Sequence, residues 1–300
     1  MTADSRKTIL AAMDTTATGR SVFKKALVLG SSMRAKVILV SVTPQYEGNM
    51  NRFFIKNAER QFSEPFRKIL EEATDYATTL GLDVHTIHRM GHPSHEIVDV
   101  ALKERANIIL LGCAKRNQMA RMLLGQTTAE ITQNGPCDVL LVPEGAAIQF
   151  NKVLVGVNCS QTNAEAAKRA FEVAESYRSE VHGLYVIDIP PDRSLRYAVQ
   201  KEAEQQARIC LQSFCSQAEQ KEIPVFTEIT CDTPDKGLVN YARKKNINLI
   251  IVGAKSAPKM LDMFWEGVIE SIASSCYCPV LVAKGNNSVA SNGEFLSFFS

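Results

Sequence analysis

Several features of membrane, secreted and nucleic-acid-binding proteins are missing from this sequence. No stretch of 18 apolar residues occurs, so no membrane-spanning helix is predicted. The first ten residues lack the apolar core of a signal peptide, and we therefore expect a cytoplasmic protein. The formal net charge of the 300 residues is only +2, which removes the electrostatic basis for binding nucleic acid.

Signatures of common catalytic classes are also absent. There is no G-x-x-x-x-G-K-S/T phosphate loop and no G-x-S-x-G nucleophile turn. The eight cysteines include no C-x-x-C pair, and we expect reduced thiols, most of them packed in the interior. Cys159 has no base near it in the sequence, so no catalytic nucleophile is predicted.

Histidine is scarce, and four of the five histidines are crowded together: His85, His88, His92 and His95. Such crowding suggests a zinc or nickel site, but a separation of three along a strand places His85 and His88 on opposite faces. No cysteine or acid completes a recognised ligand spacing. A scattered polar surface is therefore favoured over a metal site, and no metal ligand is predicted.

The sequence does contain a long internal duplication. In the later part of each copy, Pro93 and Gly112 match Pro234 and Gly253, which stand 141 residues further on. Nearer the start of each copy the offset is 144, and Asp14 then matches Asn158. A period of this length is too long for a solenoid, so each copy is expected to be a domain.

Each copy alternates apolar runs with amphipathic stretches. Residues 8–13 and 152–157 have the apolar character of strands buried on both faces, and each precedes a polar turn and a helix. The order βαβαβαβαβ occurs twice and requires parallel sheets with right-handed crossovers. We therefore predict an α/β protein made of two tandem three-layer α/β/α sandwiches, each with a five-stranded parallel sheet. The expected domains are residues 1–145 and 151–285, followed by a flexible tail at 286–300.

Motifs at the predicted strand ends carry a family resemblance. They are Asp14 after the first strand, Val42 closing the second, Gly91-x-Pro93, and Gly112 with Gly125 thirteen residues later before Thr127 and Thr128. Together they resemble the universal stress protein family, here as a tandem two-domain member. The resemblance covers about residues 5–143 and 151–284. It implies a Rossmann-like fold similar to the adenine nucleotide alpha hydrolases, with the fifth strands paired to form an internal pseudo-dimer.

The resemblance also implies a ligand for the first domain. Family members that bind ATP carry Gly, two residues, Gly, nine residues, Gly and then Ser or Thr, a loop that surrounds the phosphates. Lys115 replaces the middle glycine here, and Gln126 replaces the Ser or Thr. These two departures leave an alternative, in which side chains fill the loop and no nucleotide binds. The implied site for ATP, with Mg²⁺ accompanying it, comprises Asp14, Val42, Gly112, Lys115, Gly125, Gln126, Thr127 and Thr128.

The second copy departs further from the ATP-binding pattern. Asn158, Asp232, Ser256 and Glu266 stand at the positions of the aspartate and three of the glycines. A carboxylate at the phosphate position repels the ligand by roughly 1–4 kcal/mol for unit charges about 4 Å apart. No nucleotide is therefore expected in domain 2, which we expect to be structural or regulatory.

The resemblance implies a cytoplasmic stress-response protein that acts by binding or regulation, and the departures from the family pattern confine the expected ATP to domain 1, with little or no turnover. A slow ATPase or nucleotidyl-transfer enzyme and a nucleotide-free interaction scaffold stay open as alternatives. Met-rich segments around Met119 and Met260 are expected to form a domain or dimer interface, or to bind an unidentified protein partner. A homodimer is a further expectation beside the internal pseudo-dimer.

Overall fold

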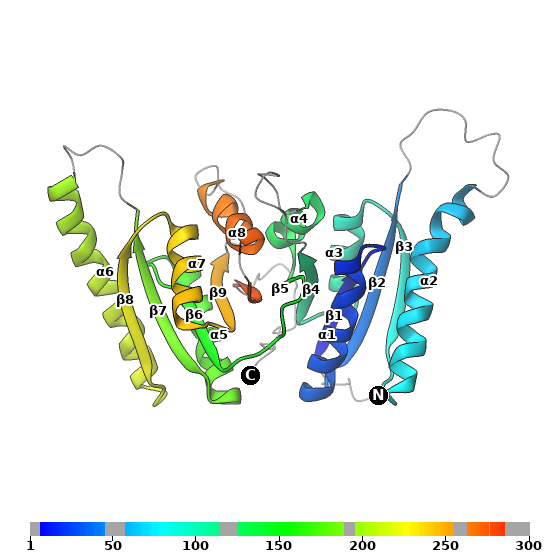
Figure 1. Ribbon diagram of the computed structural model, residues 1–300, viewed down its shortest axis with the longest axis horizontal. Helices are drawn as coiled ribbons and strands as arrows, with labels where there is room; N and C mark the ends of the chain where they lie inside the picture. Colours follow the sequence, from blue (N-terminus) through cyan, green and yellow to red (C-terminus); the bar gives the residue numbers. More distant parts are fainter. Residues whose placement is uncertain are drawn as a thin grey trace.

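In the computed structural model, the two copies form two domains that share one sheet (Figure 1). Strands and helices alternate along the chain, except at the domain boundary, where β5 is followed directly by β6. The structure describes residues 7–45, 58–113, 125–188, 196–254, 263–275 and 277–285.

Domain 1 begins with a strand and ends with a strand. Its central strands consist almost wholly of buried residues, because helices cover the sheet on both faces. The elements are β1 (Thr8–Met13), α1 (Ala17–Met33), β2 (Lys36–Pro44), α2 (Ala58–Thr79), β3 (His85–Gly91), α3 (Pro93–Lys103), β4 (Ile108–Cys113), α4 (Gln126–Asn134) and β5 (Asp138–Pro143).

Domain 2 repeats this order. Pro93 and Pro234 occupy the first turns of the matching helices α3 and α7, where a backbone N–H would have no partner within the helix and its absence costs little. The elements are β6 (Lys152–Gly156), α5 (Gln161–Tyr177), β7 (Glu180–Ile187), α6 (Arg196–Glu219), β8 (Val225–Cys231), α7 (Pro234–Lys245), β9 (Leu249–Ala254), α8 (Met263–Ser275) and β10 (Val280–Lys284).

No helix in the described ranges has the length and apolar character needed to span a membrane.

The strands form a single 10-stranded sheet in the order β3-β2-β1-β4-β5-β10-β9-β6-β7-β8. Neighbouring strands within each domain are parallel, whereas β5 and β10 pair antiparallel, with Leu140 opposite Leu281. Figure 1 shows these two strands at the centre and the long helices α2 and α6 at the outer ends. The predicted fold class and the internal pseudo-dimer are confirmed, and the pairing removes one open edge from each domain.

The helices form two layers that run through both domains. Helices α1, α2, α5 and α6 pack on one face of the sheet, where Phe171 and Phe214 are buried against each other. Helices α3, α4, α7 and α8 pack on the other face, where Ile131 and Ile272 are buried at matching positions. Each core includes residues of both domains, so apolar packing as well as strand pairing joins them.

A buried group of charges crosses the boundary between the domains. Arg169 of α5 donates from Nε to Oδ2 of Asp138 in β5 at 2.7 Å, and its Nη1 lies 3.3 Å from Oε2 of Glu172. Oδ1 of Asp138 accepts the backbone N–H of Lys284 at 2.9 Å, and Nζ of Lys284 donates to the carbonyl of Gln133 at 2.8 Å. Burial lowers the pKa of Lys284 to about 8. Loss of one partner would leave the others buried without a compensating charge.

Candidate functional site

The carboxyl ends of β1, β2 and β4 bring three of the predicted site residues together. The register pairs Met13 of β1 with Ser41 of β2. The residues that follow, Asp14 and Val42, are therefore neighbours at the carboxyl edge of the sheet. β4 lies on the other side of β1 and reaches the same edge at Gly112. The chain order reverses between β1 and β4, and open α/β sheets bind ligands at such a switch point.

Asp14 stands at the start of the tight turn that leads into α1. Oδ1 of its exposed carboxylate accepts the backbone N–H and the hydroxyl of Thr16, at 2.9 and 2.5 Å. Thr16 caps α1 by accepting the N–H of Gly19 at 3.1 Å. A Cβ on Gly19 would lie 2.0 Å from Oδ1 of Asp14, so this turn requires a glycine. The turn holds Asp14 in place, and its Oδ2 has no hydrogen-bond partner within the described part of the chain.

Packing within domain 1 accounts for Val42 and Gly112. The side chain of Val42 is buried in the core on the side of α3. A Cβ on Gly112 would lie 2.7 Å from Cγ2 of Thr18 and 2.9 Å from Cγ2 of Val22. Gly112 therefore allows α1 to approach β4 closely, a reason different from the phosphate contact that the resemblance implies.

The start of α4 is the most open part of the predicted site. Gly125 is the exposed N-cap residue, with φ of −51° and ψ of 139°, and no atom lies within 4 Å of a Cβ built there. Among the described residues no side chain caps the helix, which leaves the first N–H groups of α4 available to an anion. Gln126, Thr127 and Thr128 form the first turn, and Lys115 lies outside the described residues.

The matching turn of domain 2 keeps its hydrogen bonds but fills the space. Oδ1 of Asn158 accepts the backbone N–H and the hydroxyl of Ser160 at 2.9 and 2.5 Å. Asn163 occupies the position of Gly19, and its Oδ1 accepts the backbone N–H of Asn158 at 3.1 Å. A neutral amide thus replaces the carboxylate, and a side chain stands where domain 1 has none.

The helix that follows β9 also differs from its counterpart in domain 1. Glu266 and Gly267, which match Gly125 and Gln126, both lie within α8. The backbone at Glu266 is therefore helical, whereas at Gly125 it is extended and precedes the helix. Domain 2 consequently has no helix start at the place where α4 begins. Ser256 and the Met-rich segments around Met119 and Met260 lie outside the described residues.

One disulfide corrects the expectation that all cysteines are reduced. Cys159, in the first turn of domain 2, is bonded to Cys210 of α6, with the two Cα atoms 5.3 Å apart. The pair is separated by 51 residues, so a search for neighbouring cysteines in the sequence missed it. Bonding of Cys159 also leaves it no thiolate for nucleophilic attack. The free cysteines in the described ranges are Cys113, Cys137, Cys215, Cys231 and Cys278.

A side-chain hydrogen bond joins α3 to α4 in domain 1 and α7 to α8 in domain 2, but the donor lies on the first helix in domain 1 and on the second helix in domain 2. In domain 1, Oγ of Ser94 in α3 donates to Glu130 of α4. In domain 2, Oγ of Ser271 in α8 donates to Oδ2 of Asp235 in α7 at 2.6 Å. Each residue stands 141 positions from its counterpart, so the hydroxyl and the carboxylate have exchanged helices while the contact is kept.

The histidines of domain 1 separate into two groups. His85 is exposed, and Nε2 of His88 lies 2.8 Å from Oγ1 of Thr43. His92 and His95 instead lie together at the start of α3, with ring centroids 4.6 Å apart. The prediction of scattered polar histidines therefore describes His85 and His88 and is wrong for His92 and His95.

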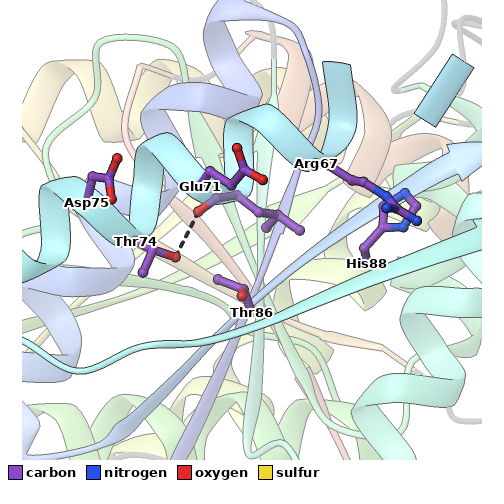
Figure 2. Close-up of a pocket in the computed structure, with 7 residues that line it drawn as sticks. Arg67, Glu71, Thr74, Asp75, Thr86 and His88 are labelled. Atoms are coloured by element: carbon purple, nitrogen blue, oxygen red, sulfur yellow. Dashed lines mark hydrogen bonds between the residues drawn. The ribbon is translucent and has the colours of Figure 1, made fainter. Parts of the chain in front are cut away.

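A hollow of about 520 Å³ lies between α2 and β3, on the other face of the sheet from α3 and α4 (Figure 2). Arg67 and His88 lie at one end of it, and burial together with the positive charge of Arg67 lowers the pKa of His88. The hollow contains none of the predicted site residues, and sequence reasoning missed it because its lining comes from two elements. The lining residues are Arg67, Leu70, Glu71, Thr74, Asp75, Thr86 and His88.

Comparison with known proteins identifies the family. The model of the universal stress protein family matches residues 5–143 and 149–284, so the chain belongs to this family. A universal stress protein of Methanocaldococcus jannaschii is 26% identical over 140 residues, covering 45% of this chain and 82% of that protein. A universal stress protein of Mycobacterium tuberculosis is 26% identical over 193 residues, covering 62% of this chain and 64% of that protein.

Solved structures agree on the architecture. The crystal structure of a universal stress protein from Archaeoglobus fulgidus has a TM-score of 0.71 at 19% identity, over 92% of this chain and 96% of that one. This likeness shows the fold alone. Two further universal stress protein structures hold adenine nucleotides, one with cAMP and one, from Arabidopsis thaliana, with AMP bound. Both match with a TM-score of 0.35, and their ligands are properties of those two proteins.

Proposed function

We propose that domain 1 binds an adenine nucleotide, ATP together with Mg²⁺, and that the chain acts as a regulatory binding protein in the stress response. One arrangement carries the proposal. Asp14 and Gly112 flank the switch point between β1 and β4, and the uncapped start of α4 at Gly125 lies at the same edge of the sheet. This edge offers a carboxylate acceptor and a helix N-terminus within one domain.

The two groups suit the two ends of a nucleotide. A carboxylate accepts hydrogen bonds from hydroxyl groups, so Asp14 is proposed to bind the ribose. The N–H groups and the dipole at the start of α4 favour the negative phosphates. Apart from Asp14, the proposed site includes no carboxylate or imidazole that would act as a general base. We therefore propose binding with little turnover.

Domain 2 is proposed to lack nucleotide and to serve a structural or regulatory role. Asn158 replaces the carboxylate, and the side chain of Asn163 fills the position of Gly19. The helical backbone at Glu266 removes the helix start that would hold phosphate. The homodimer and the partner surface at the Met-rich segments stay predictions.

A valine at Gly125 tests the placement of the phosphates. The backbone angles at Gly125 suit a side chain and a Cβ there has open space, so Gly125→Val is expected to fold normally. Its methyl groups would occupy the proposed phosphate position. We expect the affinity for Mg²⁺-ATP, measured by calorimetric titration of the full chain, to fall about tenfold or more.

Gly267→Val is the matched control, because Gly267 also has open space around its Cβ and directly follows Glu266, the residue of domain 2 that matches Gly125. It should leave the affinity unchanged. Equal affinities in all three proteins would refute the placement. An absence of binding at millimolar ATP would contradict nucleotide binding and favour the interaction scaffold. Steady release of ADP and phosphate would favour the slow ATPase, and release of pyrophosphate would favour the nucleotidyl-transfer enzyme.

A further inference from the structure

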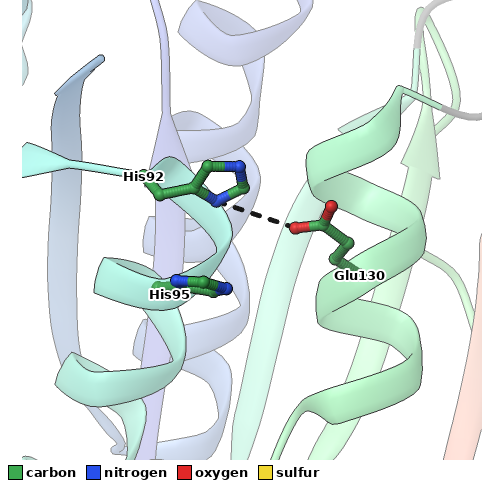
Figure 3. A group of neighbouring side chains, drawn as sticks. All are labelled: His92, His95 and Glu130. Atoms are coloured by element: carbon green, nitrogen blue, oxygen red, sulfur yellow. Dashed lines mark ion pairs between the residues drawn. The ribbon is translucent and has the colours of Figure 1, made fainter. Parts of the chain in front are cut away.

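The helix starts of domain 1 gather three metal-binding side chains that the proposed nucleotide site does not use. His92 and His95 project from the start of α3, and Glu130 projects toward them from α4 (Figure 3). One ring nitrogen of each histidine and one carboxylate oxygen all lie within 4.8 Å of one another. Nδ1 of His92 lies 3.7 Å from Oε2 of Glu130.

We propose that His92, His95 and Glu130 bind one divalent transition-metal ion of the zinc type, with water in the remaining coordination positions. Zinc binds imidazole nitrogen and carboxylate oxygen at about 2.0–2.2 Å, and two histidines with one glutamate form a set that leaves a position open. Ligand atoms of a tetrahedral zinc ion stand about 3.3 Å apart at these bond lengths. Nδ1 of His92 lies 2.9 Å from Oγ of Ser94, so the proposal requires the His92 ring to give up this contact, or to use Nε2, when it binds the ion.

The backbone fixes the positions of the two histidines. His92 is the N-cap residue of α3, and Pro93 opens the helix behind it with a restricted φ. His95 follows three residues after His92, which places both side chains on one face of the helix start. Their ring centroids are already 4.6 Å apart, so little conformational freedom is lost when both rings bind one ion.

Two neighbours orient the carboxylate. Oγ of Ser94 donates to Oε2 of Glu130, and Nε2 of Gln126 donates to Oε1 at 2.9 Å. Ser94 is only 2% exposed, so its hydroxyl is a fixed support. Such outer contacts orient metal ligands and strengthen binding.

Domain 2 provides an internal comparison. The positions that match His92, His95 and Glu130 hold Thr233, Lys236 and Ser271. A lysine ammonium repels a cation, and neither hydroxyl is a strong zinc ligand. The three ligands therefore occur together only in domain 1, and we expect one ion per chain.

Zinc titration of the full chain tests the proposal. Protein without a histidine tag is stripped with a chelator, and Zn²⁺ alone is added against a competing chromophoric chelator, with no nucleotide present. We expect one site that weakens about tenfold or more in His92→Ala, His95→Ala and Glu130→Gln. His85→Ala is the matched control, because it removes an exposed histidine from the same domain and should change nothing. Thermal unfolding of each apo variant checks that it is folded.

Cobalt binding distinguishes this site from binding by cysteine thiols, of which Cys231 is exposed. Co²⁺ bound by two histidines and a glutamate shows visible d–d bands without the near-ultraviolet band of cobalt–thiolate bonds. This spectrum gives a readout that an ordinary surface ion pair between His92 and Glu130 would not produce.

The opposite results are equally definite. No Zn²⁺ binding by the stripped protein at micromolar concentration would overturn the proposal. Binding with a cobalt–thiolate band and the same affinity in all variants would also overturn it, because the thiols would then account for the ion. Since no nucleotide is used, neither result depends on the proposed ATP site.

Discussion

Domain 1 and domain 2 keep the same contacts where elements pack and differ where the sheet edge is open. Ile131 and Ile272 are buried at matching positions, and the bond of Ser94 to Glu130 is replaced by that of Ser271 to Asp235. At the edge, by contrast, Asn163 replaces Gly19. Packing thus constrains both copies equally, whereas the open positions have changed without disturbing the fold.

The boundary between the domains is also asymmetric. Asp138 and Lys284 belong to the buried charged group, and the residues that match them in the other copy are Pro279 and Pro143. Lys25 matches Arg169, but its Nζ only approaches the carbonyl of Pro143, at 3.4 Å. The two sides of the pseudo-two-fold axis therefore use different forces, a buried ion pair on one side and a polar contact on the other.

The largest expected effect comes from removing the ion pair. Asp138→Ala should lower the free energy of unfolding by about 3–5 kcal/mol, because Arg169 is left buried without its closest partner. Lys25→Met changes the matching position on the other side and should cost less than about 1 kcal/mol. Urea unfolding followed by circular dichroism compares the two. Similar losses would show that the boundary is energetically symmetric.

The pH dependence of Lys284 gives the next largest effect. Its pKa falls from 10.5 to about 8 on folding. Between these values the unfolded chain holds a proton that the folded protein has released, so stability rises with pH. The gain should approach about 3 kcal/mol between pH 8 and 10.5, at about 1.36 kcal/mol per unit of pKa.

Urea unfolding of the wild type and of Lys284→Met across this range isolates the contribution of Lys284. The variant should lose most of the increase. An equal slope in both proteins would show that other groups are responsible.

Exchanging the two partners of the α3–α4 hydrogen bond should give the smallest effect. Ser94→Asp alone places a second carboxylate against Glu130 and should cost about 1–2 kcal/mol. Adding Glu130→Ser recreates the arrangement of domain 2 and should restore most of that loss. The coupling free energy from the four proteins of the double-mutant cycle checks this. Additive losses would mean that the two domains hold these helices together differently.

Much of the fold was predictable because local sequence patterns indicate its strands and its two domains. The apolar runs at 8–13 and 152–157 correctly indicated buried strands, and the duplication indicated two domains. The pairing of β5 with β10 followed from the family resemblance, since nothing local specifies which edges meet. Sequence reasoning also brought Asp14, Val42 and Gly112 to one edge, where the structure places them.

Contacts between distant elements were not predictable. Cys159 and Cys210 meet only because α6 packs beside the first turn of domain 2. Glu130 joins His92 because α4 packs against α3, and no spacing rule links those positions. Gly112 was interpreted through a ligand, whereas the close approach of α1 already requires a glycine there. In each case the missing information was the packing of helices, which depends on many weak contacts at once.

The covalent link between the domains has a consequence for how the chain responds to a ligand. Residues 144–151 connect β5 to β6, so the pairing of β5 with β10 is intramolecular and is not lost on dilution. A homodimer of single domains would carry two identical sites that can influence each other. The single nucleotide site that we propose for each chain would instead give a simple hyperbolic saturation curve, with a half-saturation point set by that site alone.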